Sequence, residues 1–511
     1  MHKIILVPLD ERPCNYDFPV LMTESPDYVV VRPPKVLMGQ RKTPGDPAKI
    51  LEWTVENAKD AEAAVLSVDT LLYSGIVPSR LHHDAAEVLK GRLEAVRAIK
   101  EANPGIVIYA FSLIMRNPSY SSAEEEPDYY GDFGLEIHRY GVISHKLELG
   151  IAGDGEREEL EEIRRRLPPE YLKDYLDRRA VNVEINKEAV RLTADGTFDF
   201  LVFPQDDSSP YGFTAKDQQA VREAIRDFRV NTRAYMYPDA DGVGCALLAR
   251  AMNRIEGRMP LVYVKFASVL SPQVIPLYED RPIGESVKYQ ILTAGGLPVD
   301  SLSDADLVML VNMPSGGMKE AAAADGPVKA PEYGAFRTLP ELMAQADYAL
   351  HRLGKSVIIA DVAYANGGDE LLLEMLKEQG IQWEISSYAG WNTAANSFGT
   401  CIAAAMIRQI TGPTKALEDF LALRYVEDVG YCARVRGYVA GRGLAAPGTE
   451  EGHTDGEYGS TAQLIRKLLQ EYADRKISDE AHRVVIDSLR LPWNRLFEVG
   501  LKVHVEHPAE G

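Results

Sequence analysis

Short apolar runs alternate with helical patterns along most of the chain. The runs are rich in β-branched residues and apolar at consecutive positions, as in strands covered on both faces. The segments between them carry apolar residues at three- and four-residue intervals, which indicates amphipathic helices. The predicted strands are Ile4–Val7, Ala64–Val68, Ile106–Phe111, Phe200–Phe203, Ala234–Tyr237, Leu261–Phe266, Leu307–Val311, Val357–Ile359 and Trp383–Ser386. The predicted helices include Ala85–Lys100, Glu156–Arg166, Ala215–Phe228 and Leu339–Leu353.

Strands that alternate with helices favour βαβ units and a mainly parallel sheet. Nine strands are one too many for an eight-stranded barrel, and we interpret Leu261–Phe266 as an accessory strand. Polar clusters follow nearly every strand, and barrels build their catalytic face from those loops. An open sheet concentrates its site at one switch point instead. We therefore predict a TIM-like (β/α)8 barrel, with a doubly wound parallel sheet as the alternative.

The domain organisation follows from where this alternation stops. Residues 1–412 are predicted to form the barrel-like catalytic domain, with a long insertion at about 113–195 that is acidic and aromatic before it becomes helical. Long insertions of this kind often form lids or pocket walls. Residues 413–511 are predicted to be mostly helical, with a final strand-like run at Phe497–His504 and a loop at Gly441–Gly459.

Composition narrows the cellular setting. The chain has 511 residues, and its net charge of −20 argues against a nucleic-acid or anionic-membrane partner. Four scattered cysteines without a CxxC pair indicate a reduced compartment, without a disulfide framework or zinc cluster. No apolar run reaches membrane-spanning length, and the first residues indicate a strand rather than a signal peptide. We expect a cytoplasmic protein without a cofactor, with a homo-oligomer left open.

Carboxylates, amides, arginines and aromatic residues gather after the predicted strands. Such a mixture is typical of carbohydrate sites, because carboxylates and amides bind vicinal hydroxyls and an aromatic face packs on the sugar's C–H groups. Trp391 is the predicted stacking platform, with a packed core indole as the alternative, and helix capping could explain any single cluster. The predicted substrate-binding residues are Asp10, Arg12, Asp69, Tyr73, Arg116, Asp239, Asp361, Asn366, Trp391 and Asn392.

The predicted catalytic residues are a pair of adjacent carboxylates, Asp206 and Asp207. They end the apolar run that begins at Phe198 and precede a Ser-Ser-Pro-Tyr-Gly turn. Neighbours inside a strand point to opposite faces, but neighbours where a strand gives way to a loop can face one pocket. Like charges held close push their pKa values apart, which suits acid/base chemistry. The alternative is a helix N-cap followed by a turn residue.

Other catalytic signatures are missing. The chain has no GxGxxG after a strand, no P-loop, no HExxH, no GxSxG and no histidine in a strand-end cluster. Adjacent carboxylates suit substrate-assisted glycoside hydrolysis, in which the sugar's own 2-acetamido oxygen attacks the anomeric carbon. One carboxylate orients the acetamido N–H, and the other protonates the leaving oxygen and then deprotonates water. We assign Asp206 to the first role and Asp207 to the second, with the reverse order open.

Two further functions are compatible with the same residues. The strand-end aspartates could bind Mg²⁺ or Mn²⁺, both of which prefer oxygen ligands, in a hydrolase of small polar metabolites. The chain could instead be a sugar-binding protein that a ligand stabilises without turnover. Sensitivity to EDTA separates the first alternative from metal-free glycoside hydrolysis.

Four motifs resemble one bacterial family whose domain has no assigned function. They are Val7-Pro-Leu-Asp-Glu-Arg-Pro-Cys-Asn15, Asp69-Thr-Leu-Leu-Tyr-Ser-Gly-Ile-Val-Pro-Ser-Arg80, Asp361-Val-Ala-Tyr-Ala-Asn-Gly-Gly-Asp369 and Gly390-Trp-Asn-Thr-Ala-Ala-Asn396.

The Asp206-Asp207 pair and its strand context also resemble the adjacent Asp-Asp pair of O-GlcNAcase and hyaluronidase-type N-acetylhexosaminidases, which are retaining, substrate-assisted (β/α)8 barrels. This resemblance covers the pair alone. It implies a retaining exo-β-N-acetylhexosaminidase acting on a small glycan or glycoside, with β-N-acetylgalactosaminides favoured over β-N-acetylglucosaminides.

Overall fold

The computed structural model describes residues 1–321, 330–441 and 452–508, and its long strands form two separate parallel sheets. The first sheet has the order β2-β1-β3-β4-β5-β6 and the second β13-β11-β9-β7-β8. The first sheet consists of β1 (His2–Val7), β2 (Tyr28–Val31), β3 (Ala63–Ser67), β4 (Val107–Phe111), β5 (Phe200–Gln205) and β6 (Ala234–Pro238). The second consists of β7 (Leu261–Phe266), β8 (Leu297–Val299), β9 (Leu307–Asn312), β11 (Ser356–Asp361) and β13 (Ser387–Ala389). A short parallel pair joins β10 (Lys319–Glu320) and β12 (Tyr364–Ala365).

The fold is mixed α/β with parallel sheets, but the predicted single barrel is not what the described residues form. Both sheets are open, with β2 and β6 at the edges of the first and β13 and β8 at the edges of the second. In each sheet the first strand lies between the second and third, so that the sheet grows in both directions from its first strand as doubly wound sheets do. Leu261–Phe266 is therefore no accessory strand, because as β7 it is the first strand of the second sheet. The strand predicted at Trp383–Ser386 begins later, at Ser387.

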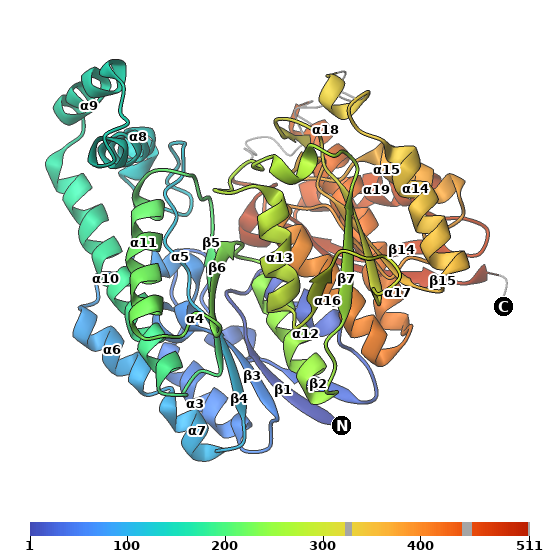
Figure 1. The fold of residues 1–511 in the computed structure, drawn as a ribbon, viewed down its shortest axis with the longest axis horizontal. Coiled ribbons are helices and arrows are strands. Elements are labelled where there is room, and N and C mark those ends of the chain that lie inside the picture. The colour runs from blue at the N-terminus through green and yellow to red at the C-terminus, as the bar shows by residue number, and fades with distance from the viewer. Residues whose placement is uncertain (322–329, 442–451, 509–511) are drawn as a thin grey trace.

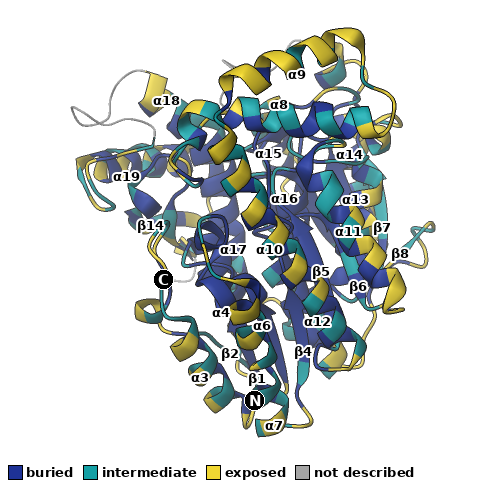
Figure 2. Cartoon of the chain, turned by 90° about the vertical axis from the view of Figure 1, so that its left-hand side faces the viewer, coloured by how far each residue is buried: buried dark blue, intermediate teal, exposed yellow. Residues whose placement is uncertain are grey.

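Both faces of the first sheet are buried, which explains its continuous apolar strands. In β1, Ile4 and Leu6 face one hydrophobic core, while Ile5 and Val7 face another. The first core packs against α12 (Val243–Ile255), and helices that include α3, α4 and α10 cover the other face. Figure 2 shows buried strands behind helices whose outer faces are exposed.

Two buried helices lie between the sheets (Figure 1). The helix α12 packs on β1, β3 and β4, α16 (Ala394–Thr411) packs on β11 and β13, and the two helices pack on each other. They meet at glycines, because a Cβ atom on Gly399 would lie 2.9 Å from backbone atoms of Gly242. The two sheets consequently share one continuous hydrophobic core.

The remaining elements lie around these sheets. The long insertion forms α8 (Tyr130–Glu148), α9 (Asp154–Arg166) and α10 (Pro169–Ala194); α8 and α9 stand at one end of the molecule, away from the strands (Figure 1). The other α-helices before residue 413 are α1 (Pro13–Tyr16), α2 (Phe18–Leu21), α3 (Pro47–Ala58), α4 (Val68–Tyr73), α5 (Ile76–Ser79), α6 (Ala86–Glu94), α7 (Arg97–Ala102), α11 (Phe213–Asp227), α13 (Ile283–Thr293), α14 (Leu339–Asp347) and α15 (Glu370–Glu378).

The C-terminal region is mostly helical and ends in an antiparallel hairpin. Its helices are α17 (Lys415–Arg424), the π-helical η6 (Tyr425–Val435), α18 (Arg436–Gly441), α19 (Ser460–Tyr472), η7 (Ala473–Ile477) and the short η8 (Pro492–Asn494). The hairpin pairs β14 (Arg483–Arg490) with β15 (Gly500–Glu506), where a final strand was predicted. Most of the predicted loop Gly441–Gly459 lies outside the described residues. In the described part of the whole chain, no helix combines the length and apolarity needed to cross a membrane.

Replacing Gly399 by alanine should destabilise the fold by roughly 1–3 kcal/mol, because an added methyl group overpacks the contact between α12 and α16. Gly244, near the start of α12, is the matched control, because a Cβ atom there would meet nothing within 4 Å. Gly244→Ala should leave stability unchanged or raise it by up to about 1 kcal/mol. Urea unfolding of both variants measures the difference. Equal stabilities of the Gly399→Ala and Gly244→Ala variants would contradict the close approach of α12 and α16 at Gly399.

Candidate functional site

A cleft of about 600 Å³ opens beyond the carboxyl ends of strands from both sheets. Doubly wound sheets bind ligands at this end. The first sheet contributes residues after β1, β3, β4, β5 and β6, and the second sheet contributes residues after β7 and β13. Asn366 follows β12 of the short β10-β12 pair, and the tip of the C-terminal hairpin closes one side. The lining residues are Arg12, Ile76, Arg116, Tyr120, Ser122, Glu124, Glu125, Asp206, Asp207, Asp241, Tyr278, Asn366, Asn392, Gly452, Arg495 and Phe497.

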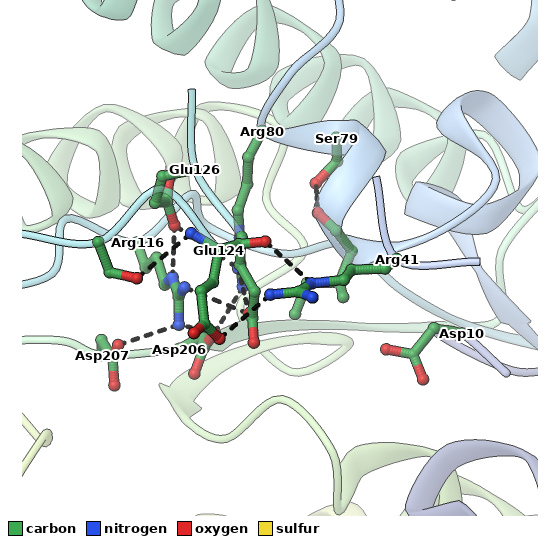
Figure 3. A network of polar contacts seen from close by, with 12 residues as sticks. Asp10, Arg41, Ser79, Arg80, Arg116, Glu124, Glu126, Asp206 and Asp207 are labelled. Atoms are coloured by element: carbon green, nitrogen blue, oxygen red, sulfur yellow. Dashed lines mark hydrogen bonds and ion pairs between the residues drawn. The ribbon is translucent and has the colours of Figure 1, made fainter. Parts of the chain in front are cut away.

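Asp206 and Asp207 both point into this cleft. β5 ends at Gln205, and Asp207 then takes a φ of +38°, in the left-handed region that aspartate tolerates better than most residues. The turn lets both carboxylates reach one guanidinium nitrogen, Nη1 of Arg116, which lies 3.5 Å from Asp206 Oδ2 and 3.1 Å from Asp207 Oδ2 (Figure 3). Neither aspartate is the N-cap of the following helix α11, whose N-cap is Gly212. The capping alternative is therefore wrong.

The two carboxylates have unequal surroundings. Asp206 also accepts a hydrogen bond of 2.6 Å from Nη2 of Arg80. Asp207 instead accepts a weaker one, of 3.3 Å, from the hydroxyl of Tyr120. Burial and the neighbouring charge of Asp206 raise the pKa of Asp207 to about 7, although Arg116 and Arg80 oppose the shift. At neutral pH a large fraction of Asp207 is therefore protonated, beside a carboxylate that two arginines hold.

Glu125 connects the arginines behind the pair. It accepts hydrogen bonds from Arg80 Nη1 at 2.9 Å and Arg116 Nη2 at 3.2 Å, and it pairs with Arg495 from the hairpin tip. Burial would raise the pKa of Glu125, but these three guanidinium groups outweigh it and hold the pKa well below its usual range. Glu126 accepts a further hydrogen bond of 2.7 Å from Nε of Arg116. Arg116 is thus fixed from behind, with Nη1 directed at the aspartates.

Arg12 forms the opposite side of the cleft together with Asp241. The guanidinium of Arg12 pairs with Asp10 at 2.7 Å and with Asp241 at 2.6 Å. Asn392 of the second sheet donates a hydrogen bond of 3.3 Å to Asp241. Burial, together with the charges of Asp10 and Asp206, raises the pKa of Asp241 to about 6 against the opposing effect of Arg12. This cluster joins the strand ends of the two sheets.

Four lining residues other than glycine have left-handed backbone conformations. The φ angles are +38° at Asp207, +68° at Tyr278, +58° at Asn366 and +52° at Asn392. Such strain tends to cluster at functional sites, where the surrounding structure holds it in place. One such restraint is a hydrogen bond of 2.8 Å that the backbone amide of Ser208 donates to the carbonyl of Tyr278. The strain thus marks the cleft independently of its charged groups.

The structure brings together only part of the predicted substrate-binding set. Arg12, Arg116, Asn366 and Asn392 line the cleft with the aspartate pair. Asp10 pairs with Arg12, and it lies apart from Asp206 and Asp207 (Figure 3). The predicted residues that do not line the cleft are Asp10, Asp69, Tyr73, Asp239, Asp361 and Trp391.

Three of these aspartates stabilise strand-to-loop turns. Asp69 accepts a 2.9 Å hydrogen bond from a backbone amide after β4, Asp239 one of 2.8 Å from the amide that begins α12, and Asp361 one of 2.7 Å from an amide before α15. Burial raises the pKa of each to about 7. These hydrogen bonds to backbone amides are reason enough for aspartate to occur after these strands. A role in ligand binding is not needed to explain it.

The two predicted aromatic residues are also internal. Trp391 packs edge-on against Phe18 at 5.8 Å and donates a hydrogen bond of 3.2 Å to Thr400, so it is a core indole and not a stacking platform of the cleft. Tyr73 is buried and donates a hydrogen bond of 3.2 Å to Asn182. The aromatic residues that line the cleft are Tyr120, Tyr278 and Phe497.

Several cleft residues were missing from the predicted set. Asp241 lines the cleft and Arg80 pairs with Asp206 behind it, and both stand in strand-end clusters. Glu125 stands in the acidic part of the insertion, so local signals existed for all three. Arg495 and Phe497 carry none, because they lie on a hairpin far along the chain from the lining residues that follow the strands of the two sheets. In the described part of the chain, potential metal donors gather in a group of three only at Glu418, His482 and His507, outside the cleft.

Comparison with known sequences assigns a family without an activity. The family model described as "Protein of unknown function (DUF4127)" matches residues 4–502, nearly the whole chain. No curated protein matches the chain. Its chemistry therefore has to be inferred from the cleft.

Replacing Asp207 by asparagine should stabilise the fold above neutral pH. Because the pKa of Asp207 is raised from 3.8 to about 7, the folded state becomes less stable as the pH rises between these values. Asp207→Asn should therefore raise the free energy of unfolding by roughly 1 kcal/mol or more at pH 8 and change it little at pH 4.

Urea unfolding at both pH values measures this effect, with Asp206→Asn as the control. That variant should be less stable than the parent protein at pH 8, because Arg80 and Arg116 lose a carboxylate partner. If Asp207→Asn lowered stability at pH 8 as well, the unequal ionisation of the pair would be wrong.

Proposed function

We propose an activity for this chain, which belongs to the family described as "Protein of unknown function (DUF4127)": it is a glycoside hydrolase, a retaining exo-β-N-acetylhexosaminidase that uses the 2-acetamido group of its substrate as the nucleophile. The observation that carries the proposal is the pair Asp206 and Asp207, adjacent in the chain, open to one cleft and unequally paired with arginine. Substrate-assisted hydrolysis needs this inequality, because one carboxylate must stay charged while the other delivers a proton.

In the first step the acetamido oxygen attacks the anomeric carbon and the bond to the leaving oxygen breaks. Asp206 accepts a hydrogen bond from the acetamido N–H, and its negative charge stabilises the positive charge that develops on the cyclic intermediate. Asp207 donates its proton to the leaving oxygen. A pKa of about 7 keeps this proton available at neutral pH.

In the second step Asp207 acts as a base. It takes a proton from water, which attacks the anomeric carbon and opens the cyclic intermediate with net retention of the β configuration. Between the steps Asp207 carries a charge, and Nη1 of Arg116, 3.1 Å away, stabilises it. Glu125 and Glu126 hold Arg116 in place, so no reorganisation of this guanidinium is required.

The rest of the cleft suits a sugar. Its volume of about 600 Å³ lies within the range of small-molecule sites. The amides of Asn366 and Asn392 and the guanidinium of Arg12 can bind ring hydroxyls. Phe497, which is 36% exposed at the hairpin tip, offers an aromatic face for the sugar's C–H groups.

The proposal rests on the carboxylate pair and its surroundings and not on the fold. The N-acetylhexosaminidases that the pair resembles are (β/α)8 barrels, whereas this chain has two open sheets. The preference for N-acetylgalactosamine over N-acetylglucosamine likewise comes from that resemblance alone, and both epimers belong in the test.

Electrostatics favour this proposal over the metal-dependent alternative. A divalent cation needs carboxylates whose charge is free, but Arg80 and Arg116 hold Asp206, and Arg12 holds both Asp10 and Asp241. These guanidinium groups already balance the charge of the carboxylates that a metal ion would need.

Asp207→Asn should lower turnover of an N-acetylhexosaminide with a poor leaving group by roughly two to four orders of magnitude. The loss should be much smaller for a nitrophenyl glycoside, whose leaving group needs little protonation. For the parent protein, kcat/KM on the poor leaving group should fall as the pH rises above about 7, because Asp207 loses its proton.

Asp206→Asn is the matched variant for this experiment. It should slow both substrates alike, because charge stabilisation does not depend on the leaving group. Equal losses on both substrates for Asp207→Asn would remove its assignment as the acid.

The 2-acetamido group should be required. We expect nitrophenyl β-N-acetylgalactosaminide or β-N-acetylglucosaminide to be cleaved, and the matching β-galactoside and β-glucoside to be inert. Activity should survive EDTA. Rapid cleavage of the plain glycosides would exclude the substrate-assisted mechanism, loss of activity in EDTA would favour the metal-dependent hydrolase, and binding without turnover would favour a sugar-binding protein.

A further inference from the structure

Three potential metal ligands meet at the end of the C-terminal hairpin that is opposite its tip. Here β14 begins and β15 ends. His482 directly precedes β14 and His507 directly follows β15, and the last cross-strand pair between them is Arg483 with Glu506. The register therefore places the two histidines side by side, with their rings 5.3 Å apart. Glu418, in the first turn of α17, completes the group, and one potential donor atom from each residue lies within 4.8 Å of the others.

We propose that His482, His507 and Glu418 bind a divalent transition-metal ion of the zinc class. Two imidazoles and one carboxylate are a donor set that zinc accepts, with a fourth position left for water. The side chains of Glu418, His482 and His507 keep 24%, 23% and 33% of their surface exposed, so an ion can enter without unfolding the chain.

The surroundings of His482 orient it as a ligand. Its Nδ1 lies 3.0 Å from Oδ1 of Asp479, and Trp383 stacks on its ring at 4.8 Å with an interplanar angle of 19°. Metal-bound histidines typically donate their second ring N–H to a carboxylate, which fixes the tautomer and raises the basicity of the other nitrogen. The contact with Asp479 thus leaves Nε2 of His482 free for the ion.

The other two ligands already touch. Nε2 of His507 lies 3.0 Å from Oε2 of Glu418. Lys415 is the nearest competing cation, with Nζ 2.9 Å from the same oxygen. It also donates to Asp419 at 2.6 Å and to the carbonyl of Val505 at 2.6 Å. These two acceptors can keep the ammonium in place when Glu418 turns to a metal ion.

The position of this site indicates what an ion would do. It would tie both strand ends of the hairpin to α17, which packs against β15 (Figure 1). The tip of the same hairpin carries Arg495 and Phe497 into the cleft. The ion would therefore stabilise the element that closes the cleft and would take no part in chemistry there.

Calorimetric titration of the full chain, free of any histidine tag, with Zn²⁺ tests the proposal. We expect a single ion per chain and a thermal midpoint that rises with Zn²⁺ concentration. His482→Asn, His507→Asn and Glu418→Gln should each weaken binding at least about tenfold, and Asp479→Asn should weaken it by roughly 10- to 100-fold.

His504→Asn is the matched control, because this histidine lies on β15 and pairs with Asp487 instead of the cluster. It should bind Zn²⁺ as the parent protein does. Circular dichroism checks that each variant is folded, and a Co²⁺ absorption spectrum of the parent protein provides a second reading of the same ligands. Binding of equal strength in the parent protein and in all three ligand variants, or no saturable binding at all, would overturn the proposal.

Discussion

The site depends on one guanidinium group that two neighbouring carboxylates share. Nη1 of Arg116 lies between Asp206 and Asp207, while Glu125 and Glu126 hold the rest of the side chain. Of the two aspartates, only Asp206 also accepts a hydrogen bond from Arg80. Burial makes two negative charges at this point costly, so the residue with fewer cationic partners, Asp207, keeps its proton into the neutral range.

The fold supplies this arrangement by placing the strand ends of two sheets opposite each other. Both sheets have the same strand order, which starts from the first strand and extends to both sides. The helices α12 and α16 join the two sheets through one hydrophobic core. The loops after the strands then meet across the cleft, with Arg12 and Asp241 on one side and Asn392 on the other. Because several of these loops hold strained conformations, the packing beneath them fixes the position of the cleft residues.

Much of this could be predicted from local sequence, and what could not depends on contacts between distant residues. The apolar runs located most strands of both sheets, and the end of the run at Gln205 located the aspartate pair. A strand's sequence does not state which strand it pairs with, so two open sheets with similar βαβ units could not be distinguished from one barrel. Trp391 and Asp361 are residue types that ligand-binding loops often contain. Their contacts, however, are with other parts of the protein interior. Arg495 could not be found from sequence at all, because the hairpin brings it to Glu125 from 370 positions away.

A crystal structure of the chain with a cyclic thiazoline analogue of N-acetylgalactosamine tests the central claim most directly. This analogue resembles the intermediate in which the acetamido group has closed on the anomeric carbon. The account predicts that it occupies the cleft with its ring nitrogen hydrogen-bonded to Asp206 and its anomeric carbon on the side of Asp207. An analogue bound away from these two residues, or a cleft left empty at saturating concentration, would contradict it.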